Sequence, residues 1–157
     1  VVGDAEPEML AHLASIESTV PWTHVPFVDR FELLPYYAAC DAVVLPSFYD
    51  GMPNVLLEAG ALGVPPVAST AGGMADLLVG GENALTFPPG DRDECRRALH
   101  DLATLPAERL RLFGERLRAT IHRDYRHDLE ASRYRALLAE TAGRTPRPAA
   151  ATALTES

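Results

Sequence analysis

Residues 42–69, which read AVVLPSFYDGMPNVLLEAGALGVPPVAS, decide the fold, because they hold two short apolar runs on either side of a helical stretch. The runs at 42–47 and 67–69 are almost continuously apolar, a pattern typical of parallel strands that are buried on both faces. Strand, helix and strand in this order predict a βαβ unit with a parallel sheet.

The helix between these strands is expected at 55–62. Asn54 precedes it and is a good N-cap, because its side-chain oxygen can accept a hydrogen bond from an amide of the first turn. Gly63 follows it at the C′ position, where glycine is preferred. The helix therefore starts in the loop after the first strand, at the edge of the sheet where such folds bind ligands.

The same alternation continues on both sides of this unit. We expect a strand to end at Val1-Val2, another at 84–87, and helices at 6–18, 33–40, 74–79, 91–105, 106–122 and 127–142. Residues 1–142 are therefore predicted to form one α/β domain, a Rossmann-like parallel sheet with helices on both faces. Residues 143–157 are rich in Pro, Ala and Thr and are expected to form a disordered tail.

Charge and hydropathy exclude several classes of protein. The chain has 157 residues and a formal net charge of -8, and all of its 14 basic residues are Arg. An acidic chain without basic runs does not fit a general nucleic-acid binder or a membrane-surface protein. Apolar stretches stay shorter than the roughly 18 to 20 residues that a membrane-spanning helix needs. We expect a cytoplasmic protein without a nucleic-acid partner.

Two cysteines and three aromatic residues are assigned to the interior. Cys40 and Cys95 lack CxxC spacing, so we expect buried, reduced thiols and no metal site. The aromatic residues that we place in the core, and not against a nucleotide base, are Trp22, Tyr36 and Tyr37.

The loop and helix after the first strand hold the residues that can carry chemistry. Gly51 lets a ligand approach the backbone closely. The amides at 54–56 lie at a helix N-terminus, which favours an anion such as a diphosphate. Glu58, one turn further, can accept hydrogen bonds from paired sugar hydroxyls. Asp50, at the mouth of the loop, could hold a second set of hydroxyls.

Each of these residues also has a plainer interpretation. Glu58 could be a solvated helix residue, and Asp50-Gly51 is a common turn dipeptide. Gly72-Gly73 could form only a turn, although its position between a strand and a helix also suits an amide cradle for an anion.

Four motifs in order together suggest a family: YYAACDAVVLPS at 36–47, DGMPNVLLEAGALGVPPVAS at 50–69, AGGMADLL at 71–78 and GENALTFPPGD at 81–91. The chain resembles, from Val1 to about Tyr134, the C-terminal donor-binding half of the GT-B fold glycosyltransferases of family 4, also called glycosyltransferase group 1. The resemblance implies an enzyme that transfers a sugar from a nucleoside diphosphate sugar, UDP- or GDP-linked, to an acceptor with retention of configuration. It implies no cofactor and no metal.

The resemblance also assigns roles to residues. The family has an acidic pair, Glu-x7-Glu, which matches Asp50 and Glu58 and makes them the catalytic candidates. Glu58 would bind the ribose and Asp50 the donor sugar. The other donor-binding candidates are Gly3, Asp4, Gly51, Met52, Pro53, Asn54, Val55 and Leu56. Segment 26–33 matches the one whose backbone meets the base.

The chain departs from the family pattern in substituted residues and in missing segments. Asp50 replaces the usual Glu and is one methylene shorter, and Asp76 stands where Glu is common. The start, Val1-Val2-Gly3-Asp4, is typical of the middle of a longer protein. The acceptor-binding N-terminal domain and the first segment of this domain, with its Arg and Lys for the diphosphate, are absent. We expect weak donor binding and no turnover from the chain alone, and membrane association only through the missing part.

Other functions are open on the same residues. A non-catalytic remnant or interaction domain could keep the fold without its partner half. A sugar-nucleotide epimerase of GT-B shape is a minor alternative. A dinucleotide oxidoreductase is disfavoured, because GxGxxG does not follow a first strand.

Overall fold

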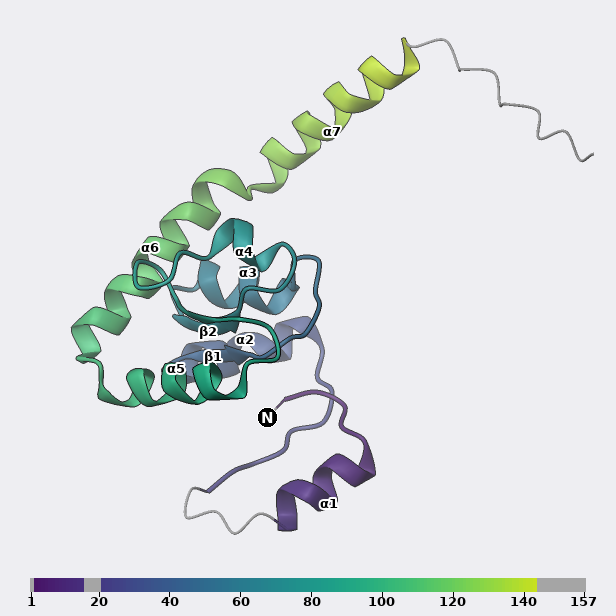
Figure 1. The fold of residues 1–157 in the computed structure, drawn as a ribbon. Coiled ribbons are helices and arrows are strands. Elements are labelled where there is room, and N and C mark those ends of the chain that lie inside the picture. The colour runs from purple at the N-terminus through teal and green to yellow at the C-terminus, as the bar shows by residue number, and fades with distance from the viewer. Residues whose placement is uncertain (1, 16–20, 144–157) are drawn as a thin grey trace, which may run out of the picture.

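The computed structural model describes residues 2–15 and 21–143, which form an α/β fold (Figure 1). The elements are α1 (Pro7–Ser15), α2 (Arg30–Ala39), β1 (Val43–Leu45), α3 (Asn54–Ala61), β2 (Pro66–Ser69), α4 (Met74–Leu77), β3 (Leu85–Phe87), α5 (Arg92–Thr104), α6 (Ala107–Asp124) and α7 (His127–Ala142). Of the predicted tail at 143–157, only Gly143 is described, as the residue that ends α7, and the predicted helical residues 16–18 also lie outside the described residues.

The three strands form one parallel sheet in the order β1-β2-β3. Val43 pairs with Pro66 at one interface, and Val67 pairs with Leu85 at the other. The predicted βαβ unit and the parallel sheet are therefore confirmed.

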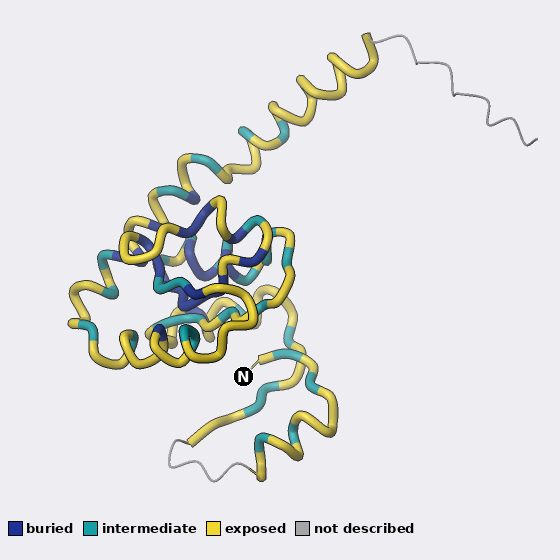
Figure 2. Tube along the Cα trace, viewed as in Figure 1, coloured by how far each residue is buried: buried dark blue, intermediate teal, exposed yellow. Residues whose placement is uncertain are grey.

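Helices cover both faces of the central strand β2, because neighbouring residues of a strand point to opposite faces. Ala68 packs in a cluster with Leu56 of α3 and Leu117 of α6. Val67 packs on the other face, against Ala98 of α5. Figure 2 shows the buried residues concentrated between these layers, around β2, α3 and α4.

Strand β1 is less buried than its apolar sequence predicts. Val44 keeps 44% of its surface exposed, so the expectation of a strand buried on both faces is wrong here. The reason is that β1 is the edge strand of this sheet, and α5 packs chiefly on β3 and β2.

The N-terminal end of α3 differs from the prediction, and its C-terminal end agrees with it. Pro53 is the N-cap residue and makes no side-chain capping bond, so Asn54 is the first residue of the helix and not its cap. Gly63 follows the helix with a φ of +82°, as expected of a C′ glycine.

The predicted interior residues are only partly buried. Cys40 is exposed and Cys95 is half-buried, and both thiols are free. Among the aromatic residues Tyr37 is buried, but Trp22 and Tyr36 expose 43% and 41% of their surface. The cause is position: Trp22 lies in the chain before α2, and Tyr36 lies on the side of α2 away from the cluster around Tyr37.

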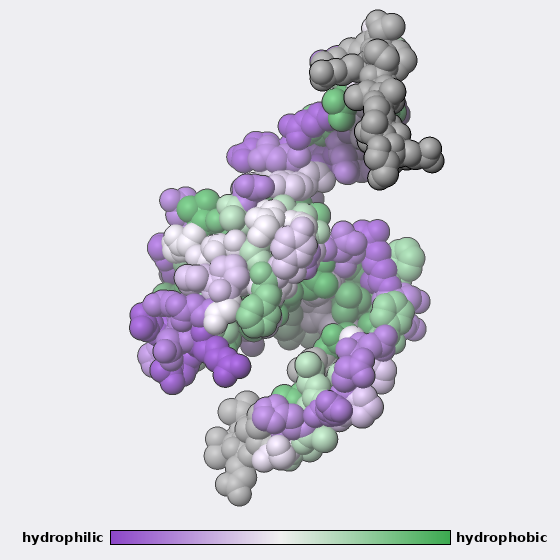
Figure 3. All heavy atoms as spheres, turned by 45° about the vertical axis from the view of Figure 1, so that its right-hand side comes forward, coloured by the Kyte–Doolittle hydropathy of each residue, from purple (hydrophilic) through white to green (hydrophobic). Residues whose placement is uncertain are grey.

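The two ends of the described chain pack loosely. Val2 forms a parallel bridge with Val25, apart from the main sheet, and neither α1 nor α7 has a buried residue. Residues 2–15 and 21–28 form an N-terminal arm, and the elements from α2 onward form the body. Figure 3 shows apolar side chains gathered in the hollow between the arm and the body. In the part of the chain that is described, no helix is both long and apolar enough to cross a membrane.

Candidate functional site

The loop between β1 and α3 is held against the turn after β2. The amide of Gly73 donates a hydrogen bond of 2.6 Å to the carbonyl oxygen of Gly51. A Cβ atom on Gly72 would lie 1.8 Å from the carbonyl oxygen of Asp50, and the φ of Gly72 is +52°. The Gly72-Gly73 pair therefore serves a close backbone contact, and the amide of Gly73 is already used within the protein.

A buried hydroxyl joins the carboxyl ends of the first two strands. Ser69, at the end of β2, is fully buried and donates a hydrogen bond of 2.6 Å to the carbonyl oxygen of Ser47. The loops that leave these strands are thus fixed side by side at the edge where ligands bind in parallel sheets.

Unlike Gly72, Gly51 is not required by the backbone conformation or by a close contact. Its φ is not positive, and nothing lies within 4 Å of the position that a Cβ would take. The fold would accept a side chain at Gly51. A glycine there leaves the backbone open to a ligand.

Helix α3 begins without a side-chain capping hydrogen bond. Leu56 and Leu57 donate their amides to the carbonyl oxygen of Pro53, while the amides of Asn54 and Val55 have no hydrogen-bond partner among the residues of 2–15 and 21–143. Two free amides and the helix dipole make this N-terminus attractive to an anion.

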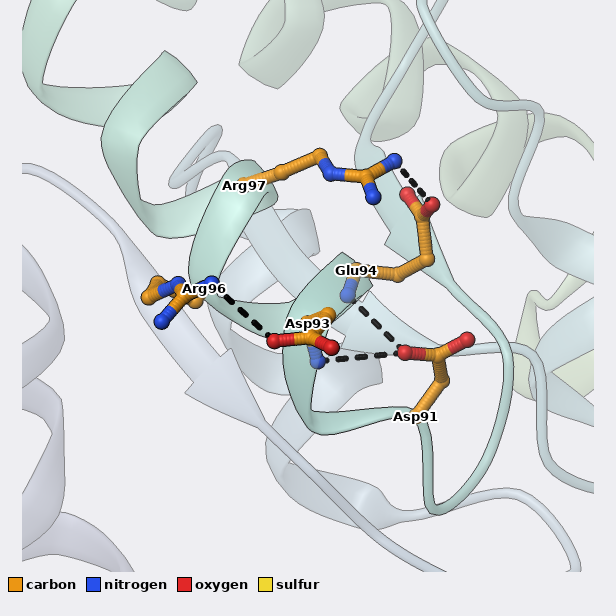
Figure 4. A network of polar contacts seen from close by, with 5 residues as sticks. All are labelled: Asp91, Asp93, Glu94, Arg96 and Arg97. Atoms are coloured by element: carbon orange, nitrogen blue, oxygen red, sulfur yellow. Dashed lines mark hydrogen bonds and ion pairs between the residues drawn. The ribbon is translucent and has the colours of Figure 1, made fainter.

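Helix α5, which follows β3, begins quite differently. Asp91 accepts hydrogen bonds from the amides of Asp93 and Glu94 at 3.1 and 3.0 Å, as Figure 4 shows. Arg96 and Arg97 pair with Asp93 and Glu94 on the same turn. The first amides of α5 are therefore occupied by the protein, and α3 is the better anion site.

Glu58 is held on both carboxylate oxygens. Its side chain is only 15% exposed, and its Oε1 lies 2.9 Å from Nε of Arg30. The hydroxyl of Tyr37 donates to Oε2 over 3.2 Å. Burial, and then the charge of Glu58, raise the pKa of Tyr37 to about 12, so the phenol remains a proton donor to Glu58 well into the alkaline range. The interpretation of Glu58 as a solvated surface residue does not describe this arrangement.

The other predicted site residues lie in two places. Asp50 is half-buried in the loop before α3, and its carboxylate has no partner in the part of the chain that the structure describes. Gly3 lies on the N-terminal arm, where its amide donates to Val25 and its carbonyl oxygen accepts from Nε2 of His24. Asp50, residues 51–56 and Glu58 thus share α3 and its loop, while Gly3 and Asp4 sit on the arm.

Sequence reasoning did not find the cavity beside this loop. It has a volume of about 730 Å³ and reaches from Met52 and Asn54 to Asp76 on α4 and to Tyr125 and Tyr134 near the α6–α7 junction. The two tyrosines lie in no motif, so only the fold brings them near α3. A group of three or more side chains suited to a metal ion does not occur within the described ranges.

Comparison with known proteins identifies relatives of known class. The model of the family described as "Glycosyl transferases group 1" matches residues 1–104. Glycogen synthase of Mycobacterium tuberculosis is 32% identical over 122 residues, which are 77% of this chain and 30% of that protein.

Solved structures agree on the fold. Sucrose-phosphate synthase from Thermosynechococcus elongatus superposes with a TM-score of 0.72 at 27% identity, over 88% of this chain and 38% of that one. Anabaena HepE in complex with UDP-glucose superposes with a TM-score of 0.65 at 22% identity, over 90% of this chain and 40% of that one. The chain therefore spans less than half the length of each of these relatives.

Proposed function

We propose a donor-binding function for this chain, which belongs to the glycosyltransferase group 1 family. In the proposal the chain is the domain that holds a nucleoside diphosphate sugar, UDP- or GDP-linked, for a retaining glycosyltransferase. The proposal rests on helix α3, which has free amides at its start and a carboxylate held in place, Glu58, one turn later.

The geometry suggests a role for each part of α3. The free amides of Asn54 and Val55 would face the diphosphate, whereas the amide of Leu56, also expected there, already donates to Pro53. The carboxylate of Glu58 would accept hydrogen bonds from the ribose hydroxyls. Asp50, which has no partner among the described residues, would hold the hydroxyls of the donor sugar. Met52 and Pro53 would line the site through their backbone, and the Gly3-Asp4 segment would lie near the nucleotide once the arm is in place.

The transfer exchanges one bond at the anomeric carbon of the donor sugar for another. The bond from this carbon to the β-phosphate oxygen breaks, and a bond to the acceptor hydroxyl oxygen forms on the same face. The electron pair of the broken bond leaves with the nucleoside diphosphate, which takes the acceptor's proton. Amides at the start of α3 would stabilise the charge that develops on the leaving phosphate.

The wider assignments follow from the same proposal. The remainder of the enzyme would supply the acceptor site, so the isolated chain would bind donor weakly and not turn it over. No cofactor and no nucleic-acid partner are required. Free Cys40 and Cys95 suit a reducing, cytoplasmic location, and the UDP-glucose bound by HepE suits a nucleotide-sugar donor.

Calorimetry tests the proposal directly. UDP, GDP and ADP are titrated into the wild-type chain, into Glu58→Ala and into Glu108→Ala, a control at an exposed glutamate on α6. We expect saturable binding of one nucleotide that Glu58→Ala weakens at least tenfold and Glu108→Ala leaves unchanged. Absence of binding at millimolar nucleotide would contradict a donor site and favour a remnant or interaction domain.

A further inference from the structure

The candidate site is poor in positive charge. Residues 1–91, which include every loop at the carboxyl ends of the strands, contain one Arg, no Lys and twelve of the 22 acidic residues. That single cation is Arg30, and the next arginine is Arg92, at the start of α5. A nucleoside diphosphate would bring further negative charge into this acidic surrounding, so it needs a nearby guanidinium.

Helix α2 fixes the backbone position of Arg30. It is the first residue of α2, whose start is capped by Asp29 through hydrogen bonds from the amides of Phe31 and Glu32 at 2.8 and 3.0 Å. From this capped turn the side chain reaches Glu58, 28 residues further along the chain, with its Nε 2.9 Å from Oε1.

Only one edge of the Arg30 guanidinium is used. Its Nη atoms donate to no residue within 2–15 and 21–143, and the side chain is 74% exposed. A guanidinium presents five N–H donors in a rigid plane, so the Nη groups remain available for the oxygens of a phosphate. The pairing with Glu58 leaves this open edge next to the carboxylate assigned to the ribose.

The hydrogen bond from Tyr37 can hold the carboxylate of Glu58 in position when the side chain of Arg30 moves. Tyr37 is buried and holds Oε2, whereas Arg30 is exposed and holds Oε1. Of the two partners of Glu58, the buried one positions the carboxylate, and the exposed one can turn toward an incoming anion without exposing the carboxylate's second oxygen.

We propose that Arg30 binds a phosphate oxygen of the nucleotide donor through its Nη groups while it neighbours Glu58, and so supplies the counter-charge of the diphosphate from within this chain. This inference rests on the proposed donor-binding function. It makes Arg30 a determinant of affinity for the phosphate and not for the nucleoside.

A second arginine, Arg133 on α7, also lies near α3 and provides the matched comparison. It lines the cavity that reaches Asn54, but this cavity also contains the carboxylates of Asp76, Asp124 and Glu130. Asp124 is paired with Arg123, but Asp76 and Glu130 still oppose the charge of Arg133. We therefore expect Arg133 to contribute less to phosphate binding than Arg30.

The test compares UDP with uridine, and GDP with guanosine, by NMR chemical-shift titration of the wild-type chain, Arg30→Gln, Arg30→Lys and Arg133→Gln. We expect Arg30→Gln to weaken nucleotide binding at least tenfold and to leave nucleoside binding within twofold. Arg30→Lys should restore part of the loss, because it keeps the charge without the planar fork. Arg133→Gln should keep the wild-type ratio of nucleotide to nucleoside affinity.

Three results would overturn the role of Arg30 in different ways. If Glu58→Ala abolishes nucleotide binding but Arg30→Gln keeps the wild-type ratio, the donor site stands and the role of Arg30 does not. If Arg30→Gln weakens nucleoside and nucleotide equally, Arg30 only positions Glu58. If the wild-type chain binds neither UDP nor GDP, the donor-binding function and the role of Arg30 fail together.

Discussion

At the scale of single residues, Glu58 separates what a sequence can predict from what it cannot. Its spacing from Asp50 and its place on a helix after a buried strand identified it as a carboxylate of interest. Its partners, Tyr37 and Arg30, lie 21 and 28 residues away and meet it only because α2 and α3 pack together. No local pattern carries such contacts.

Tyr37 should make stability depend on alkaline pH. Its folded-state pKa of about 12 lies above the ordinary value of 10.0 for a tyrosine, so the unfolded chain loses the proton first as pH rises. The contribution of protonated Tyr37 to the free energy of unfolding is complete below pH 10 and is lost between pH 10 and about 12. We expect the free energy of unfolding, measured by urea denaturation, to fall more steeply over this range in the wild type than in Tyr37→Phe.

The same variant has an expected cost at neutral pH. Loss of the phenol hydroxyl removes a hydrogen bond to a mostly buried carboxylate, which should lower the unfolding free energy by about 1–2 kcal/mol.

Equal pH profiles of the unfolding free energy for the wild type and Tyr37→Phe would show that Tyr37 is not the titrating group and that its contact with Glu58 is weak.

Two glycines of the loop region should respond in opposite ways to the same substitution. Gly51→Ala meets open space at an ordinary φ, so we expect its unfolding free energy to stay within about 0.5 kcal/mol of wild type while its donor affinity falls. Gly72→Ala places a Cβ against the carbonyl oxygen of Asp50 at positive φ and should cost about 2 kcal/mol or more.

Thermal denaturation and nucleotide titration of both glycine variants measure these effects. Gly81→Ala serves as a control, because Gly81 has a φ of +77° without a neighbour within 4 Å, and it isolates the strain of positive φ from the overlap. A Gly51→Ala variant that unfolds readily, or that binds donor as well as wild type, would contradict the ligand role assigned to this glycine.

At the scale of elements, types and order were predictable but edges were not. The alternation of apolar runs and helical spacing predicted the βαβ unit, because burial imposes these periods on the sequence. Helix α3 was predicted to start at Val55 but starts at Asn54. Pro53, with its φ of −68° and no N–H, already suits the cap position. The exposure of Val44 depends on which helix covers β1, which an apolar sequence does not reveal.

At the scale of the whole molecule, the chain corresponds to only part of the length of its relatives. It spans 30% of its glycogen synthase relative and 38% of its sucrose-phosphate synthase neighbour. Its net charge of -8, concentrated in the half that holds the candidate site, opposes an anionic donor. Motif order predicted the family, but the location of α7 and of the cavity beside Asn54 needed the three-dimensional arrangement, because no motif marks them.

The amide resonances of α3 report on whether a nucleotide binds at the start of this helix. In an NMR titration of the wild-type chain with UDP and GDP, the donor-site account predicts that the largest shifts fall on the amides of Asn54 and Val55, with smaller ones at Gly51 and Glu58. The amides of Asp93 and Glu94, which Asp91 already caps, should stay unmoved. Saturable shifts confined to α5, α6 or α7, without shifts in α3, would show that the nucleotide does not bind at α3.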